Sequence, residues 1–135
     1  MTVVDASVWV SAFMHDEPNH AVSLRWLSSH SAAGGRIDCP ASFLPEVAGA
    51  IARRAGSPGP ALAAVAAISR VPGLAVHDID RRLADESAAV AGDLGLRGPD
   101  ALYVALALAT GAELVTWDGE QLRRAAGVVR TATPS

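Results

Sequence analysis

Short apolar segments alternate with longer segments of mixed polarity along the whole chain. The short segments are too brief for helices and lack the polar side of an exposed strand, so each is expected to form a buried strand. The predicted strands are residues 2–4, 37–40, 74–77 and 113–116, with a last strand at residues 128–130.

The stretches between these strands carry apolar residues at helical spacing and are bounded by capping residues and glycines. They predict helices over residues 5–13, 18–33, 43–55, 61–69, 80–94 and 100–110, with a short last helix from residue 118. Strands that alternate with helices favour a parallel sheet covered by helices on both faces. We therefore expect an α/β fold, a three-layer α/β/α sandwich around a central, mostly parallel sheet of four to five short strands.

The composition fits one small domain. The chain has 135 residues, half of them hydrophobic, and its strongest loop signal, residues 56–60, is too short for a domain linker. We expect a single domain over residues 1–135. The formal net charge is −3 and all eleven basic residues are arginine. Binding of a nucleic acid would therefore need local arginine patches and bound metal rather than bulk charge.

Nothing in the chain predicts export or membrane insertion. Cys39 is the only cysteine, which excludes an internal disulfide and a cysteine-rich zinc site. An acid interrupts the apolar start at Asp5, unlike a signal peptide, and the longest apolar stretch, residues 101–109, is too short to span a membrane. We expect a cytoplasmic protein without membrane contact.

Four acidic residues occupy positions that a parallel sheet would bring together. Asp5 and Asp118 follow predicted strands, and ligands of such folds gather at the carboxyl ends of the strands. Asp100 heads an apolar helix, and Glu46 lies within another, on the flank of its apolar stripe. Each aspartate is also well placed to cap a helix, and Glu46 to face solvent, so a purely structural interpretation stays open.

If the four carboxylates meet, they need a counterion. Two carboxylates ~4 Å apart at an effective dielectric of ~20 repel each other by ~4 kcal/mol. An oxygen-only ligand set suits Mg²⁺ or Mn²⁺ rather than zinc, and such an ion supports phosphodiester chemistry. The four histidines show no ligand spacing with each other. Receiver domains and haloacid-dehalogenase-type phosphatases also use aspartates at strand ends, but both need a lysine that this chain lacks.

Four segments carry a resemblance to a known family: Val4-Asp5-Ala6-Ser7, Pro45-Glu46-Val47, Asp100-Ala101-Leu102-Tyr103-Val104-Ala105-Leu106-Ala107 and Leu114-Val115-Thr116-Trp117-Asp118. Over essentially its whole length the chain resembles the PIN-domain ribonucleases, specifically the VapC-type toxins of type II toxin–antitoxin systems. The opening segment and the Asp100 segment are specific when taken together. All four acidic positions of the family pattern are filled.

The resemblance implies a PIN-like fold and an endoribonuclease that depends on Mg²⁺ or Mn²⁺. The catalytic residues carried over are Asp5, Glu46, Asp100 and Asp118. Asp5 and Asp100 would hold the principal metal ion, Glu46 would act partly through water, and Asp118 would orient a water or complete a second metal position. In-line attack by metal-activated water would leave a 5′-phosphate and a 3′-hydroxyl.

Substrate contacts are expected from hydroxyls and arginines. Ser7 and Thr116 match hydroxyl positions that line the family's site, although ordinary hydrogen bonding at a helix start explains them equally well. Arg97 is the first choice for an RNA contact because it lies close to Asp100. The pairs Arg53–Arg54 and Arg81–Arg82 are further choices, and every one of these arginines also fits a solvated helix end.

The resemblance also implies a small cognate antitoxin, which pushes a basic residue into the acidic site. Apolar residues in 8–27 and 43–51 favour an antitoxin helix, a homodimer or a toxin–antitoxin hetero-oligomer, with burial inside the domain as the alternative. The alternative function is a catalytically silent PIN module that binds RNA or a partner through the same acidic pocket.

Overall fold

A five-stranded parallel sheet forms the middle of the molecule. The computed structural model describes residues 1–135 and arranges the strands in the order β3-β2-β1-β4-β5, with every neighbouring pair parallel. The strands are β1 (Thr2–Val4), β2 (Ile37–Pro40), β3 (Leu74–His77), β4 (Glu113–Val115) and β5 (Thr131–Ala132). The predicted α/β fold with a parallel central sheet is confirmed.

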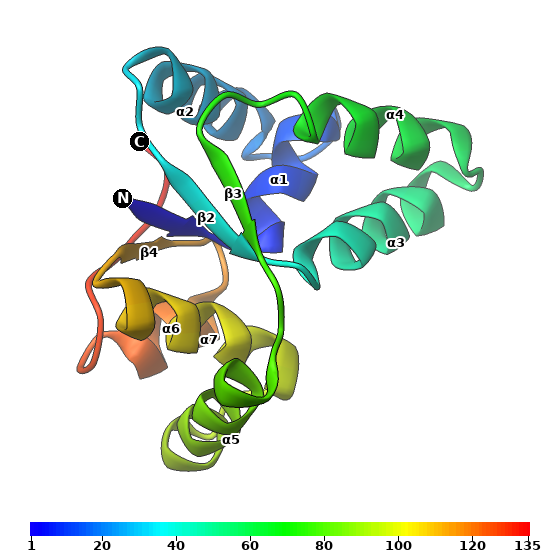
Figure 1. Cartoon of the computed structure of the whole chain (residues 1–135). Coiled ribbons are helices and arrows are strands. Elements are labelled where there is room, and N and C mark those ends of the chain that lie inside the picture. Colours follow the sequence, from blue (N-terminus) through cyan, green and yellow to red (C-terminus); the bar gives the residue numbers. More distant parts are fainter.

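Helices cover both faces of this sheet (Figure 1). They are α1 (Ala6–Phe13), α2 (His20–Ala32), α3 (Phe43–Ala55), α4 (Gly59–Ile68), α5 (Arg81–Leu94), α6 (Gly98–Thr110) and α7 (Gly119–Ala125). In Figure 1 the helices α1 to α4 lie on one side of the strands, and α5 to α7 lie on the other. The predicted three layers are therefore present. No helix is long and apolar enough to cross a membrane.

The last strand differs from the prediction. Residues 128–130 form no strand, and β5 comes just after them at Thr131–Ala132. The backbone N–H groups of Val128 and Val129 both donate to the carbonyl of Ala125 at the end of α7, so they are not available to a sheet. The two valines have the right β-branched character, but the end of the helix takes their hydrogen-bonding groups.

The centre of the sheet is the best-buried part of the protein. Val3 and Val4 of β1 have no solvent-exposed surface, and neither does Leu114 of β4. On the α1 side, the rings of Trp9 and Phe43 pack at 5.7 Å between centroids. This packing makes β1 and β4 a rigid support for whatever follows their carboxyl ends.

The order of the strands places a crevice at those ends. From β1 the chain proceeds to β2 and β3 on one side, whereas β4 and β5 lie on the other side of β1. Loops that leave adjacent strands in opposite directions open a crevice between them, which is where ligands bind in open α/β sheets. The residues that follow β1 and β4 therefore face this crevice.

Gly73 allows the turn into β3 to pass close to the turn before β2. It has a φ of +81°, and an added Cβ would lie 2.5 Å from the carbonyl oxygen of Gly35. Gly111, which ends α6, has a similar φ of +69° but open space around it. An alanine at either position would adopt a strained left-handed backbone, but only an alanine at Gly73 would also clash with a neighbouring atom. Comparing the two substitutions therefore isolates the effect of the clash.

We expect Gly73→Ala to lower the free energy of unfolding by clearly more than Gly111→Ala does. A left-handed backbone conformation alone costs a non-glycine residue about 1–3 kcal/mol, and only Gly73→Ala adds a backbone clash. Urea denaturation of both variants would measure the difference. Equal losses would mean that the close approach of Gly35 and Gly73 does not constrain the sheet.

Candidate active site

Asp5 follows β1 directly and is held against β4. Its backbone N–H donates to the carbonyl of Val115 at 3.0 Å, which continues the parallel ladder beyond the end of β1. Its carboxylate Oδ2 accepts from the backbone N–H of Ser7 at 2.9 Å and so caps α1. The residue is only 6% exposed. Asp5 is thus both a helix cap and a nearly buried carboxylate at the crevice.

Asp118 comes three residues after β4, at the start of α7. One carboxylate oxygen, Oδ1, accepts from the backbone N–H groups of Glu120 and Gln121 at 2.8 and 3.3 Å, which caps α7. The capping interpretation of Asp5 and Asp118 is therefore correct. It does not compete with a functional one, because both side chains also line a shared cavity.

Asp100 and Glu46 reach the same cavity from helices. Asp100 lies in the first turn of α6, which begins at Gly98 rather than at Asp100, so it does not cap the helix. Glu46 lies in the first turn of α3, and its Oε1 accepts from the hydroxyl of Tyr103 at 3.1 Å. A negative charge in the first turn of a helix is favoured by the helix dipole.

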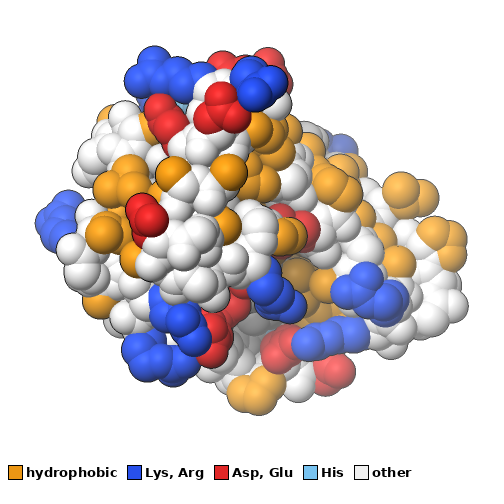
Figure 2. Space-filling view, turned by 90° about the horizontal axis from the view of Figure 1, so that it is seen from below, with side chains coloured by type: hydrophobic (Ala, Val, Ile, Leu, Met, Phe, Trp, Pro, Cys, Tyr) orange, Lys and Arg blue, Asp and Glu red, His pale blue; other side chains and the backbone are white.

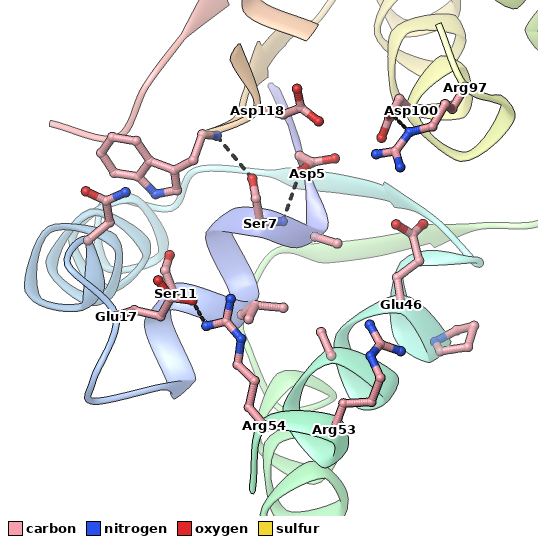
Figure 3. A pocket seen from close by; sticks show the side chains of 16 residues that line it. Asp5, Ser7, Ser11, Glu17, Glu46, Arg53, Arg54, Arg97, Asp100 and Asp118 are labelled. Carbon is pink, nitrogen blue, oxygen red and sulfur yellow. Dashed lines mark hydrogen bonds and ion pairs between the residues drawn. The ribbon is translucent and has the colours of Figure 1, made fainter. Parts of the chain in front are cut away.

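The four acids line one cavity of about 490 Å³. Figure 3 shows their carboxyl groups around the same open space, although they come from four separate parts of the chain. On the face seen in Figure 2, carboxylate and arginine side chains lie side by side around a recess. The fold thus brings all four predicted catalytic acids together.

Burial, and to a smaller extent the charges of the neighbouring acids, raises the pKa of two of these acids. Burial, with smaller contributions from the charges of Asp5 and Asp100, raises the pKa of Glu46 from 4.5 to about 7. Burial and the charge of Asp118 also raise the pKa of Asp100. A raised pKa means that the charged form is disfavoured, so the cluster has unmet demand for positive charge.

The donor chemistry of the cavity fits a hard divalent cation. No group of three or more His, Cys, Asp or Glu side chains is arranged to hold a metal ion by itself. Mg²⁺, however, commonly keeps several waters and binds proteins through one or two carboxylates. Asp5 and Asp100, at 6% and 9% exposure, are the most buried of the four acids and could supply such a pair.

Arginines line the cavity beside the acids. Arg53, Arg54 and Arg97 all contribute to its wall. The Nε of Arg97 lies 3.2 Å from Oδ2 of Asp100, and Arg54 forms an ion pair with Glu17. Arg97, the first choice for an RNA contact, thus lies beside Asp100 at the cavity, and its contact with RNA stays a prediction.

Arg81 and Arg82 lie elsewhere. They are on α5, paired with Asp85 and Glu86 one helical turn away, and they do not line the cavity. Sequence alone could not separate them from Arg53 and Arg54, because both pairs stand at the end of a helix.

The two predicted substrate hydroxyls have different positions. Ser7 lines the cavity, whereas Thr116 is fully buried and does not reach it. The Thr116 hydroxyl lies 2.7 Å from Oε1 of Gln121, and it accepts from the backbone N–H of Asp118 at 2.9 Å. Thr116 therefore links the side chain of Gln121 to the backbone of Asp118 in the interior of the protein.

Sequence analysis did not single out Asn19, which lines the cavity, or Gln121, whose buried side chain contacts Asp5. A polar residue three positions after Asp118 on a short helix carries no sequence signal, because its burial depends on how α7 packs against α6 and β5.

In metal-free protein, we expect Glu46→Gln to raise the free energy of unfolding at pH 8 but not at pH 4. The pKa of Glu46 is raised in the folded state to about 7. Its contribution to stability is therefore complete below pH 4.5 and is lost as the pH rises to about 7, because the unfolded state ionises first. Glutamine keeps an acceptor for Tyr103 without the charge.

After a discount for the partial exposure of Glu46, the expected gain at pH 8 is about 1 kcal/mol, or ~4 °C in Tm. Thermal unfolding in EDTA between pH 4 and pH 8 would measure it. Asp93→Asn, an exposed change on α5, serves as the control and should leave the pH dependence unaltered. A parallel shift of Glu46→Gln at every pH would contradict the expectation.

Comparison with known proteins agrees with this architecture. The model of the PIN domain family matches residues 2–128. No curated protein matches the chain. A crystal structure of Mycobacterium tuberculosis VapC20, a Sarcin-Ricin loop cleaving toxin, is similar with a TM-score of 0.76 and 20% identity, over 96% of both chains.

Two complexes contain similar chains. VapBC2 from Rickettsia felis, bound to a DNA fragment from its promoter, has a TM-score of 0.75 and 13% identity over 99% of this chain and 98% of that one. A toxin–antitoxin complex from Klebsiella pneumoniae has a TM-score of 0.70 and 18% identity over 100% and 98%. These structures share the fold, and the family model covers nearly the whole sequence; the chain therefore belongs to the PIN domain family.

Proposed function

We propose that this protein is a metal-dependent endoribonuclease and the toxin component of a type II toxin–antitoxin system. The observation that carries the proposal is the convergence of Asp5, Glu46, Asp100 and Asp118 on one cavity with arginines in its wall. Carboxylates alone would repel an RNA backbone. A cation held between them, together with arginines at the rim, would supply the positive charge that attracts and neutralises a phosphodiester.

Asp5 and Asp100 would hold Mg²⁺ or Mn²⁺. Both are nearly buried, and they come from β1 and α6, which are packed against each other. When bound, the ion would neutralise charge on the phosphoryl oxygens and lower the pKa of a water. Glu46, whose carboxylate accepts from the Tyr103 hydroxyl, would act partly through water, and Asp118, whose carboxylate accepts from the start of α7, would orient a water.

Arg53 is the arginine best placed to bind an RNA phosphate. Arg54 is engaged by Glu17 and Arg97 by Asp100, whereas Arg53 forms no ion pair. Its guanidinium reaches back along α3 to Gly49, and the side chain lines the cavity on the same helix as Glu46 (Figure 3). An unpaired arginine loses no protein partner when it binds phosphate, so its contribution to affinity is the least offset of the three.

An antitoxin helix would bind in a second, apolar cavity. This cavity has a volume of about 360 Å³ and lies between α1, α2 and the approach to β3. Its wall includes Trp9, Phe13, Leu24 and Leu27, and Leu24 is 45% exposed. The similar chain from Klebsiella pneumoniae belongs to a toxin–antitoxin complex, which supports a partner of this kind.

A catalytically silent binding module is the second candidate function. It is favoured by one observation, that no three of the acidic side chains are already arranged around a common metal position. The two candidates differ in what happens to RNA when Mg²⁺ or Mn²⁺ is added: the enzyme cleaves it, and the module only binds it.

We expect Asp5→Asn and Asp100→Asn each to reduce RNA cleavage by at least ~100-fold, because each removes a ligand charge from the proposed ion. Cleavage by the unaltered protein should need Mg²⁺ or Mn²⁺ and leave 5′-phosphate ends, which ligation-based sequencing of RNA ends detects. Asp93→Asn should cleave normally. Retained cleavage in either site variant would refute the ligand assignment.

We expect Arg53→Gln to weaken RNA binding and to reduce the slope of log affinity against log salt by ~0.7, the value for one lost phosphate contact to a single strand. Fluorescence anisotropy with single-stranded RNA in EDTA, where no cleavage is expected, would measure both. Arg81→Gln removes the same charge on α5 and is the matched control. An equal loss in both variants would point to net charge rather than to a contact at the cavity.

A further inference from the structure

The side chain of Gln121 lies beneath the acid cluster and has no solvent-exposed surface. Its Nε2 lies 3.2 Å from Oδ1 of Asp5 and 3.2 Å from the backbone carbonyl oxygen of Asp100. Its Oε1 lies 2.7 Å from the hydroxyl of Thr116. One amide thus contacts the segments that carry two of the four acids, and reaches a third through Thr116.

The orientation of this amide follows from its partners. The carboxylate of Asp5 and the carbonyl of Asp100 can only accept hydrogen bonds, so both must face the NH₂ group, which has two N–H donors. The amide oxygen must then face Thr116, whose hydroxyl has the proton to donate to it. A flipped amide would set its oxygen against two acceptors and leave all of them unsatisfied.

The direction of the remaining hydrogen bonds is then determined. Because the single hydroxyl proton of Thr116 goes to Gln121, Thr116 can only accept from its other neighbours. These are the backbone N–H of Asp118 at 2.9 Å and the hydroxyl of Ser7 at 3.4 Å. The Ser7 hydroxyl in turn accepts from the backbone N–H of Trp117 at 3.1 Å.

This series of hydrogen bonds ends at the carboxylate of Asp5. Both oxygens of the Asp5 carboxylate accept an N–H, Oδ1 from Gln121 and Oδ2 from the backbone of Ser7. Each oxygen can accept a second interaction. The carboxylate is therefore held in one orientation by two neutral donors, and the capacity that is left faces the cavity.

We propose that Gln121 is a positioning residue of the active site, which orients the Asp5 carboxylate for a divalent cation and fixes the start of α6, with Asp100, at its side. The inference rests on the proposed function, since it assumes that Asp5 and Asp100 hold the ion. It adds that their spacing is set by one neutral amide and by the inward-pointing hydroxyl of Thr116. Neutral donors suit this task, because a buried cation in the same place would compete with the metal ion.

The choice of substitution follows from the geometry. Methionine has nearly the length and volume of glutamine, so Gln121→Met keeps the packing of α7 while removing both donors and the acceptor. Asp5 Oδ1, the Asp100 carbonyl and the Thr116 hydroxyl each lose a partner. Ile68→Val, at a fully buried position on α4 away from the cavity, is the control for a loss of core packing.

The test is the affinity for Mn²⁺ alone, measured on the full chain without RNA. Electron paramagnetic resonance of free Mn²⁺ gives the dissociation constant, and thermal unfolding is recorded in parallel. Gln121→Met is expected to bind Mn²⁺ 10–100-fold more weakly, as is usual when a residue that orients a metal ligand is removed. Ile68→Val is expected to lower Tm with an unchanged affinity.

Two variants of Thr116 test the hydrogen bond that its hydroxyl donates to Gln121. They can be measured even if Gln121→Met does not fold. Thr116→Val removes the proton donated to the amide and should weaken Mn²⁺ binding by roughly 3–10-fold, since it acts one bond further from the ligand. Thr116→Ser retains the hydroxyl and should restore the affinity. In the Gln121→Met background, Thr116→Val should have a smaller effect than in the unaltered protein, because the link to Gln121 is already broken and only the contacts of Thr116 with Asp118 and Ser7 are left to lose.

The outcomes separate the two levels of the proposal. If Asp5→Asn abolishes Mn²⁺ binding but Gln121→Met binds within 2-fold of the unaltered protein, Gln121 is no more than a structural residue and the inference fails alone. Thr116→Val with undiminished affinity, or Thr116→Val and Gln121→Met with additive effects, overturns it as well. If the unaltered protein binds no Mn²⁺, the proposed function and this inference fail together.

Discussion

The partial burial of four mutually repelling carboxylates beside one cavity is the constraint around which the structure is organised. Folding brings Asp5, Glu46, Asp100 and Asp118 to that cavity, and the cost of burial, with a smaller contribution from repulsion, appears in the raised pKa values of Glu46 and Asp100. The largely buried strands β1 and β4 hold Asp5 and Asp118 in place, since an acid that follows a rigid strand cannot move away from its neighbours. The packed sheet thus keeps the carboxylates close together, whereas a more flexible framework would let them move apart.

The protein offsets this repulsion mostly without adding positive charge. Neutral donors contact the acids: the Ser7 backbone and Gln121 at Asp5, and the Tyr103 hydroxyl at Glu46. The one arginine in contact with the cluster, Arg97, has a side chain that is 83% exposed, so water screens much of its charge from Asp100. A divalent cation can therefore displace it at small cost, so the cavity keeps the negative potential that such an ion needs.

Much of this arrangement could be predicted from sequence, because it depends on local signals. Apolar runs located four of the five strands, and the acids at strand ends and helix starts identified the cavity. The last strand was misplaced, since the valines at 128 and 129 look like a strand but close the end of α7. The position of Thr116 and the role of Gln121 were out of reach for a different reason. Both depend on contacts between residues more than a hundred positions apart in the sequence, such as the contact of Gln121 with Asp5. A single sequence carries no signal for such contacts.

Helix capping and the function of the site are two uses of the same carboxylates. Asp5 caps α1 with Oδ2, and Asp118 caps α7 with Oδ1, so each aspartate is fixed by backbone N–H groups that no side-chain motion can remove. A cap constrains the carboxylate more tightly than a flexible ion pair would, because its donors belong to the helix itself. The interpretation of these residues as caps and their interpretation as ligands are therefore complementary. A residue that starts a helix at the carboxyl end of a buried strand is already oriented toward the crevice, and the fold needs no further device to aim it there.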